Sequence, residues 1–190
     1  NNTIANNVSA HEGGGLALDD ATFVNLVNNT VARNITTATA VTSDGTAAPA
    51  GLSTGANSDP LQARLRDATQ FPGSSILANT LFSKPTIMND VFWDNRAGYI
   101  NATGGVSGIT ALDANSWDMG AADLSGVLSP INSVIQTALG TLGPDGGSSS
   151  ARSHTRVITS PYGVHDNIPA SRPHPAPPTA GDGPLSAPRP

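Results

Sequence analysis

Apolar and polar residues alternate over short stretches at the start of the chain, and no long helical period appears there. Strand-like pieces stand at 2–7 (NTIANN), 13–18 (GGGLAL) and 22–34 (TFVNLVNNTVARN). In the last piece the alternation breaks at 27–29, where two asparagines follow a valine. Such a break predicts two short strands joined by a corner, because asparagine favours tight backbone turns. The pattern therefore predicts repeated short strands rather than amphipathic helices.

The same heptad returns along the chain. NNTIANN at 1–7 is followed by NNTVARN at 28–34, and NDVFWDN at 89–95 matches the second copy. Self-similarity at a spacing of about 20–50 residues is typical of solenoids and repeat arrays. A unit with three short strands is what a right-handed parallel β-helix uses, so we expect an all-β fold of this type.

Stacking of successive coils explains why the heptad recurs. In a parallel β-helix each strand pairs with the equivalent strand of the next coil, about 4.8 Å away, so equivalent positions must tolerate one another. The predicted apolar ladder is Ile4, Val31 and Phe92, and the predicted amide ladder at a corner is Asn7, Asn34 and Asn95. We expect Gly13, Gly14 and Gly15 to form a sharp corner, because glycine allows positive φ and close backbone approach.

These stretches resemble the right-handed parallel β-helix repeat proteins, the pectate-lyase-like superfamily in its broad sense. NDVFWDNRAG at 89–98 resembles a late coil of bacterial surface proteins of that class, and 115–135 resembles the segment that follows their last coils. The resemblance covers roughly 1–36 and 75–135. It implies the fold and a secreted or cell-surface location, and it is almost silent on activity.

The repeat also suggests how the chain is divided. Its last part is rich in proline and holds ten of the fifteen prolines of the chain. A short helix is expected at 61–68 (LQARLRDA), inside a Gly- and Ala-rich insertion. The predicted segments are a partial β-helix at 1–139, with coils at 1–36 and 75–112, an insertion loop at 37–74, a closing segment at 113–139, and a disordered or linker tail at 140–190.

The repeat is already present at Asn1, whereas repeat domains usually start with an atypical capping unit. We therefore expect the chain to be a fragment that is contiguous with further coils of a longer protein. Composition agrees with this class, because only 12% of residues are charged and 4% are aromatic. The net charge is −5 and the arginines are scattered, so nucleic acid is not an expected partner. No apolar run reaches about 18 residues, so no membrane span is expected.

Catalytic residues, metal ligands and cofactor sites are not predicted. The chain has no cysteine, which removes thiolate chemistry. The resemblance implies that active lyases of the superfamily carry rows of Asp for calcium, but the corresponding rows here carry Thr, Asn, Ala and Ser. Arg33 and Asp94 share one repeat position and predict an ion pair between coils. The acidic doublet at 19–20 faces two ways on a strand, and His11–Glu12 lacks the second His of a zinc motif.

Two further sets of residues are candidates for binding. Trp93, Tyr99 and Trp117 are candidates for stacking on a sugar ring, with core packing or capping as the alternative. Five Asn-x-Ser/Thr sequons occur, at Asn1, Asn7, Asn28, Asn34 and Asn101. Coil stacking already accounts for the four inside the repeat, so they do not require glycosylation.

Two functions remain open. The first is a non-catalytic structural and binding module of a secreted or cell-surface, adhesin-like β-helix protein, with a polysaccharide or another surface protein as partner. The alternative is the C-terminal fragment of a carbohydrate-active β-helix enzyme, a polysaccharide lyase or a glycoside hydrolase, whose catalytic coils lie upstream of Asn1. The small polar composition and the lack of catalytic rows favour the first.

Overall fold

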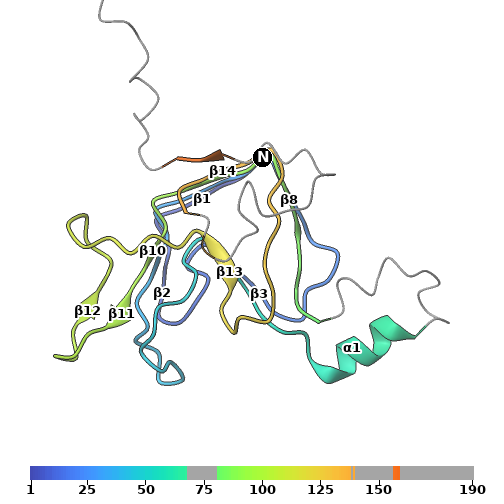
Figure 1. The fold of residues 1–190 in the computed structure, drawn as a ribbon, viewed down its shortest axis with the longest axis horizontal. Coiled ribbons are helices and arrows are strands. Elements are labelled where there is room, and N and C mark those ends of the chain that lie inside the picture. The colour runs from blue at the N-terminus through green and yellow to red at the C-terminus, as the bar shows by residue number, and fades with distance from the viewer. Residues whose placement is uncertain (68–80, 138, 140–155, 159–190) are drawn as a thin grey trace, which may run out of the picture. The chain divides into compact units, whose positions relative to one another are not determined.

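The computed structural model describes residues 1–67, 81–137, 139 and 156–158. The chain divides into two compact units, Asn1–Ser160 and Pro161–Pro190, and every described residue belongs to the first. The described part is all-β, with fifteen short strands and one short helix (Figure 1). Apart from one antiparallel hairpin, its strand pairs are parallel.

The parallel strands form four sheets, which we call A to D. Sheet A contains, in order, β1 (Thr3–Ala5), β5 (Thr30–Ala32), β9 (Val91–Trp93), β14 (Val134–Ile135) and β15 (Arg156–Val157). Sheet B contains β2 (Val8–Ser9), β6 (Ile35–Thr36) and β10 (Arg96–Ala97), and sheet C contains β3 (Leu16–Leu18), β7 (Leu52–Thr54) and β13 (Met119–Ala121). Sheet D contains β4 (Asn25–Val27) and β8 (Thr86–Met88).

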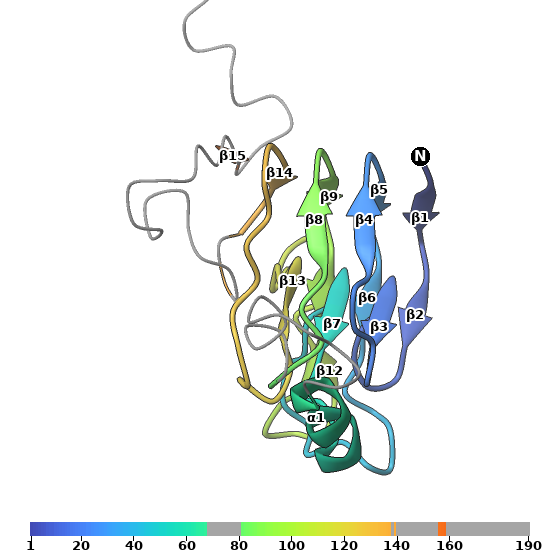
Figure 2. The ribbon, with the colours of Figure 1, turned by 90° about the vertical axis from the view of Figure 1, so that its right-hand side faces the viewer.

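The chain passes through these sheets repeatedly in the same order. We call each passage a tier: tier 1 comprises β1–β3, tier 2 comprises β4–β7, and tier 3 comprises β8–β10 and β13. Figure 2 shows equivalent strands of successive tiers side by side, with β1 at one end of the row. The register places Ile4 beside Val31 and Val31 beside Phe92, which are the positions of the predicted apolar ladder.

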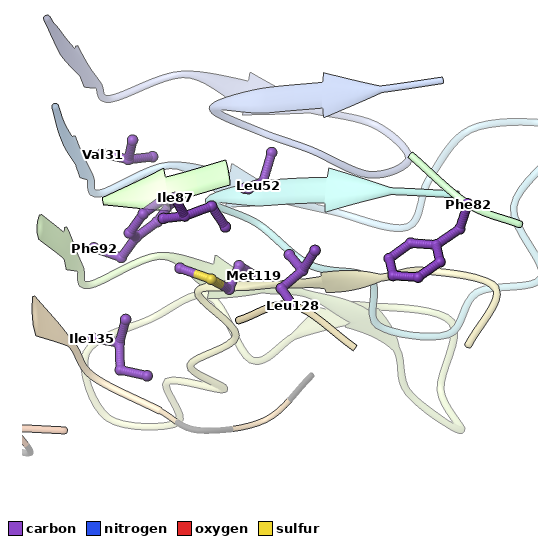
Figure 3. Packing of buried hydrophobic residues seen from close by; sticks show 8 residues of the cluster. All are labelled: Val31, Leu52, Phe82, Ile87, Phe92, Met119, Leu128 and Ile135. Carbon is purple, nitrogen blue, oxygen red and sulfur yellow. The ribbon is translucent and has the colours of Figure 1, made fainter. Parts of the chain in front are cut away.

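The interior is filled by side chains that face inward from successive tiers. The buried apolar cluster consists of Val31, Leu52, Phe82, Ile87, Phe92, Met119, Leu128 and Ile135 (Figure 3). Ile4 and three leucines of tiers 1 and 2 pack against this cluster and remain half-buried. Full burial of one such side chain stabilises a fold by about 1.5–3 kcal/mol, so the cluster is the main source of stability.

The prediction of an insertion loop at 37–74 is wrong in one respect, because strand β7 lies inside this range. Leu52 pairs with Leu16 and is fully buried, so this stretch is a strand of tier 2. The composition of 42–60 indicates a loop, but Gly51–Leu52 repeats the Gly15–Leu16 step that enters sheet C. The additional residues of tier 2 therefore form two separate excursions, a loop before β7 and a longer segment after it.

The second excursion contains the helix α1 (Asp59–Arg66), close to the predicted position. Ser58 caps its N-terminus, Pro60 stands in its first turn and Leu65 is its buried residue. No helix among the described residues is long and apolar enough to cross a membrane. In tier 3 the connection from sheet B to sheet C carries a hairpin of β11 (Tyr99–Ile100) and β12 (Val106–Ser107).

Two of the segments expected to lie beyond the coils also contribute strands. The predicted closing segment at 113–139 contains β13 and β14, which continue sheets C and A. The tail expected at 140–190 to be disordered or a linker contains β15, which pairs in parallel with β14, so that prediction is wrong at Arg156–Val157. Proline-rich composition hides a two-residue strand because such a short pairing needs only backbone groups. Apart from Ile158, the remainder of that tail lies outside the described residues.

Candidate functional site

An amide ladder crosses three tiers at the corner between sheets A and B. Asn7 donates from Nδ2 to Oδ1 of Asn34 at 2.9 Å, and Asn34 donates in the same way to Asn95 at 3.0 Å. The backbone N–H groups of Asn7 and Asn34 donate to the same two oxygens. Asn34 and Asn95 are fully buried, so these amides are structural and are not available to a glycan or another ligand.

A second ladder, which sequence reasoning missed, crosses the corner between sheets D and A. Asn2 donates from Nδ2 to Oδ1 of Asn29 at 3.0 Å, and Asn29 donates to Oδ1 of Asp90 at 3.0 Å. The signal was present, because these residues hold the second position of each heptad copy. This signal is easy to overlook, because the first two copies begin with two consecutive asparagines and only the second asparagine of each pair belongs to the ladder.

The other member of each pair turns the corner with positive φ. At the corner between sheets A and B these residues are Asn6, Arg33 and Asp94, with φ of 60°, 56° and 53°. At the other corner they are Asn28, Asn89 and Asn132, with φ of 59°, 59° and 49°. Asparagine and aspartate tolerate this left-handed region better than other non-glycine residues, so the heptad needs them in pairs.

The first ladder ends on a buried carboxylate. Oδ1 of Asp118 accepts a hydrogen bond from Nδ2 of Asn95 at 3.0 Å, and Oδ2 accepts from the backbone N–H groups of Gln136 and Thr137. Burial raises the pKa of Asp118 above its ordinary value, although these three donors act in the opposite direction. Asp118 therefore joins tier 3 to the segment that follows β14, and its role is structural.

The three glycines of the predicted corner differ in what they contribute. Gly13 has φ of +59°, which favours glycine. Gly14 and Gly15 have no such φ but touch the next tier, because a Cβ on Gly14 would lie 2.5 Å from the Ile35 carbonyl oxygen. A Cβ on Gly15 would lie 2.6 Å from the Gly51 carbonyl oxygen. This corner positions the turn at 11–12 beside sheet C.

Loops around sheet C enclose a groove of about 450 Å³. It lies where β3, β7 and β13 end, and the loop at 42–48 and the turn at 11–12 also line it. Its carboxylates come from four separate segments, Glu12, Asp19, Asp44 and Asp123, and we call it the acidic groove. Threonine and serine hydroxyls line it as well, and its lining contains no Phe, Tyr or Trp.

Hydrogen bonds hold three of these carboxylates in place. Oε2 of Glu12 accepts from the Ser53 hydroxyl at 3.0 Å, which fixes it over sheet C. Hydrogen bonds from the side chain and N–H of Thr46 lower the pKa of Asp44. These hydrogen bonds fix the carboxylates of Glu12 and Asp44 at the wall of the acidic groove.

Asp123, on the opposite wall of the acidic groove, is also held in place by hydrogen bonds. Its Oδ2 accepts from the Ala56 N–H at 2.7 Å and its Oδ1 from the Ser125 N–H at 2.9 Å. Burial acts to raise the pKa of Asp123, but hydrogen bonds from Ser125 and Ala56 outweigh burial and hold it below its ordinary value. Asp123 is thus charged throughout the neutral range.

The doublet Asp19–Asp20 lies at a bend just after β3, where Asp20 has φ of 48°, and its two side chains have different partners. Asp19 lines the acidic groove, whereas Oδ1 of Asp20 accepts from the N–H of Ser58 at 2.6 Å and anchors the start of α1. His11 lies at the rim, with its Nδ1 atom 4.0 Å from Oε1 of Glu12. In the part of the chain that the structure describes, no group of three or more His, Asp or Glu is arranged to hold a metal ion.

The expected ion pair between Arg33 and Asp94 is present but weak. Their closest atoms are 4.0 Å apart and the Arg33 side chain is 71% exposed. Asp94 instead pairs with Arg96, whose Nε and Nη2 donate at 2.7 Å and 2.9 Å. Sequence reasoning missed Arg96 because it is two residues away, across the corner, rather than one tier away. These groups line a small hollow of about 310 Å³.

The three candidate sugar-stacking residues lie on different elements. Trp93 is half-buried in β9, on the outer side opposite the buried Phe92, and Tyr99 is exposed on β11. Trp117 precedes β13 and donates from Nε1 to the Met119 carbonyl at 3.1 Å. None of the three lines the acidic groove.

Comparison with protein-family models, with curated proteins and with solved structures found no match for this chain. The fold and the groove therefore define its class: an all-β chain of parallel sheets, joined by amide ladders, with an acidic groove at the ends of one sheet.

Proposed function

We propose that the described segment is part of a right-handed parallel β-helix and that the chain is a structural and binding module. The observation that carries this proposal is the threefold recurrence of strand, corner and strand in one register, with Asn7, Asn34 and Asn95 bonded tier to tier. The right hand follows from the general rule for parallel strands joined by a crossover connection. A secreted or cell-surface location, as in adhesin-like proteins, is part of the proposal.

A binding role fits the acidic groove better than catalysis. An acid–base pair needs one carboxyl with a raised pKa, but the hydrogen bonds at Asp44 and Asp123 lower theirs. Asp118, the carboxyl whose pKa is raised, is buried at the end of the first amide ladder and does not line the groove. Support for the alternative, a piece of a carbohydrate-active enzyme, is limited to the presence of carboxylates in a groove.

The ligand that we propose for the acidic groove is a neutral or amine-bearing polysaccharide. Carboxylates accept hydrogen bonds from sugar hydroxyls, and the Ser and Thr hydroxyls both accept and donate them. Carboxylates also attract protonated amines. A polyuronate would be repelled, because four carboxylates line the groove and no Lys or Arg does. This choice separates the proposal from enzymes that act on galacturonan.

The test is a binding assay with three soluble polymers: a neutral glucan, chitosan and polygalacturonate. Asp19 is the residue to change, because it is exposed and its side chain makes no hydrogen bond among the described residues. We expect Asp19→Asn to weaken binding of chitosan, with Asp59→Asn on the surface of α1 as the matched charge control. Equal effects of the two substitutions would show that the acidic groove is not the binding site. Release of shorter sugars from any polymer would favour the enzyme alternative.

A further inference from the structure

We propose that the small hollow at the corner between sheets A and B binds a glutamate or aspartate side chain from an acidic segment of a partner protein. The hollow has a volume of about 310 Å³ and is lined by Asn6, Arg33, Ile35, Asp94 and Arg96. These residues come from the same corner of tiers 1, 2 and 3, so the hollow lies along the side of the stack and not at its end. It shares no lining residue with the acidic groove, and the two sites are therefore separate.

The backbone of Arg33 carries a cost that its contacts do not offset. Arg33 has φ of 56°, whereas the equivalent corner residues of tiers 1 and 3 are Asn6 and Asp94, which tolerate this region better. Among the described residues, Arg33 pairs with Asp94 at 4.0 Å while 71% of its side chain is exposed, and such a pair contributes little stability. Strained backbone of this kind is typical of functional positions. A ligand for the guanidinium group accounts for an arginine at this corner, whereas stability does not.

The guanidinium group of Arg33 has unused hydrogen-bond donors. Within the described part of the chain it makes no hydrogen bond, because its Nε atom stays 4.0 Å from Oδ2 of Asp94. The side chain of Asn6, one tier away, is exposed and makes no hydrogen bond to any described residue either. A planar guanidinium group can donate to both oxygens of a carboxylate at once, and an amide N–H adds a further donor. The hollow thus offers donors that suit a carboxylate.

Arg96 adds a second positive charge and fixes it in place. Its Nε and Nη2 atoms donate to the two carboxylate oxygens of Asp94 at 2.7 Å and 2.9 Å, and Nη1 donates to the Ile109 carbonyl at 2.9 Å. Asp94 balances one of the two guanidinium groups, so the lining keeps a net charge of +1. A singly charged carboxylate balances this charge, whereas a doubly charged phosphate would exceed it. The charge of the hollow therefore favours one carboxylate.

The apolar part of the lining indicates what carries the carboxylate. Ile35 lies beside Arg96 in the register of sheet B and is half-buried. A glutamate side chain has an apolar stem that can pack on Ile35 while its carboxylate reaches Arg33. The lining contains no Phe, Tyr or Trp on which a sugar ring would stack. These features favour an amino-acid side chain over an acidic sugar.

The probe is a tetraglutamate peptide with blocked ends, titrated into the full chain at low salt, with tetraglutamine as the uncharged control. We expect saturable shifts of the Nε–H resonances of Arg33 and Arg96 with tetraglutamate and none with tetraglutamine. Tetraglutamate should bind more than about fourfold more tightly than acetate, which is the gain that the number of its carboxylates alone would give. Equal shifts with tetraglutamine would overturn the carboxylate site, and a smaller gain over acetate would overturn the peptide as its ligand.

Arg33→Asn is the decisive variant, because asparagine suits φ of 56° and the fold should be retained. We expect it to weaken tetraglutamate binding at least about tenfold, whereas Arg64→Asn, at an exposed position of α1, should change binding less than about twofold. Equal binding by these two variants would overturn the proposal. Arg33→Lys keeps the charge but lacks the planar fork, so unchanged binding by this variant would refute bidentate recognition. Asp19→Asn in the acidic groove should not weaken tetraglutamate binding, which keeps this test separate from that of the groove.

Discussion

Replacing Asn34 by alanine tests whether the amide ladder stabilises the fold or merely accompanies it. Asn34 is fully buried and its side chain takes part in four hydrogen bonds. Oδ1 accepts from the Nδ2 and N–H of Asn7, and Nδ2 donates to Oδ1 of Asn95 and to the Ile4 carbonyl, at 3.0 Å in both cases. The substitution removes all four and leaves the Ile4 carbonyl without this donor.

The expected loss follows from these contacts. A net value of about 1 kcal/mol for each hydrogen bond, together with a partly buried carbonyl left unpaired, gives a loss of about 3–5 kcal/mol in the free energy of unfolding. Asn7→Ala is the matched control on the same ladder. Asn7 is exposed at the end of the ladder and loses one side-chain donor at 2.9 Å, so we expect a loss of about 0.5–1 kcal/mol.

The assay is urea unfolding followed by circular dichroism. With a urea m value of about 2 kcal/mol per molar, the midpoint for Asn34→Ala should fall by roughly 2 M, against less than about 0.5 M for Asn7→Ala. If Asn34→Ala is unfolded in plain buffer, sucrose restores a measurable transition for all three proteins. Losses for the two variants within about 0.5 kcal/mol of each other would refute the ladder as a source of stability.

Three other predictions concern corners and charges. Gly51→Ala should cost about 2–3 kcal/mol, because its Cβ would lie 2.3 Å from the Asp118 carbonyl, whereas Gly55→Ala, with its nearest atom at 3.7 Å, should cost little; thermal melts compare the two. Arg33→Asn should stabilise by about 0.5–1 kcal/mol, because Asn tolerates φ of 56° better and the ion pair lost is exposed. Hydrogen bonds from the Ser58 side chain and N–H lower the pKa of Asp20, so its carboxylate stabilises the fold above its unfolded pKa and this contribution is lost as the pH falls through the folded value. Acid unfolding below about pH 4 should therefore be less steep for Asp20→Asn than for the unmodified chain.

The register of sheet A was predictable because it repeats within one sequence. Ile4, Val31 and Phe92 share a heptad position, and identical positions must stack when strands pair in parallel. The glycine corner was predictable for a related reason, since few residues other than glycine fit where one tier touches the next. Periodicity thus carries information about neighbours along the stacking direction.

The acidic groove could not be predicted by the same means. Its carboxylates lie on a turn of tier 1, a loop of tier 2 and the ends of strands, and these excursions differ in length from tier to tier. Periodicity says nothing about residues outside the repeat, so only coordinates show that Asp44 and Asp123 line one cavity. Strand β7 was missed because its outward Ser53 and inward Thr54 are polar, and both are buried by the loop and the core around them.

In the two ladders, the identity of a single residue, Asn or Asp, determines how far the run of amide hydrogen bonds continues. Asparagine both accepts and donates, so Asn29 and Asn34 pass the hydrogen bonding on to the next tier. A carboxyl group offers two acceptor oxygens and no amide donor, and both runs of amides end on one, at Asp90 and Asp118. The side chain of Asp90 accepts from Asn29 and from the Met88 N–H of its own tier. An aspartate in the ladder position, as at Asp90, therefore ends an amide run, whereas an asparagine, as at Asn34 and Asn95, needs a further acceptor for its Nδ2 group.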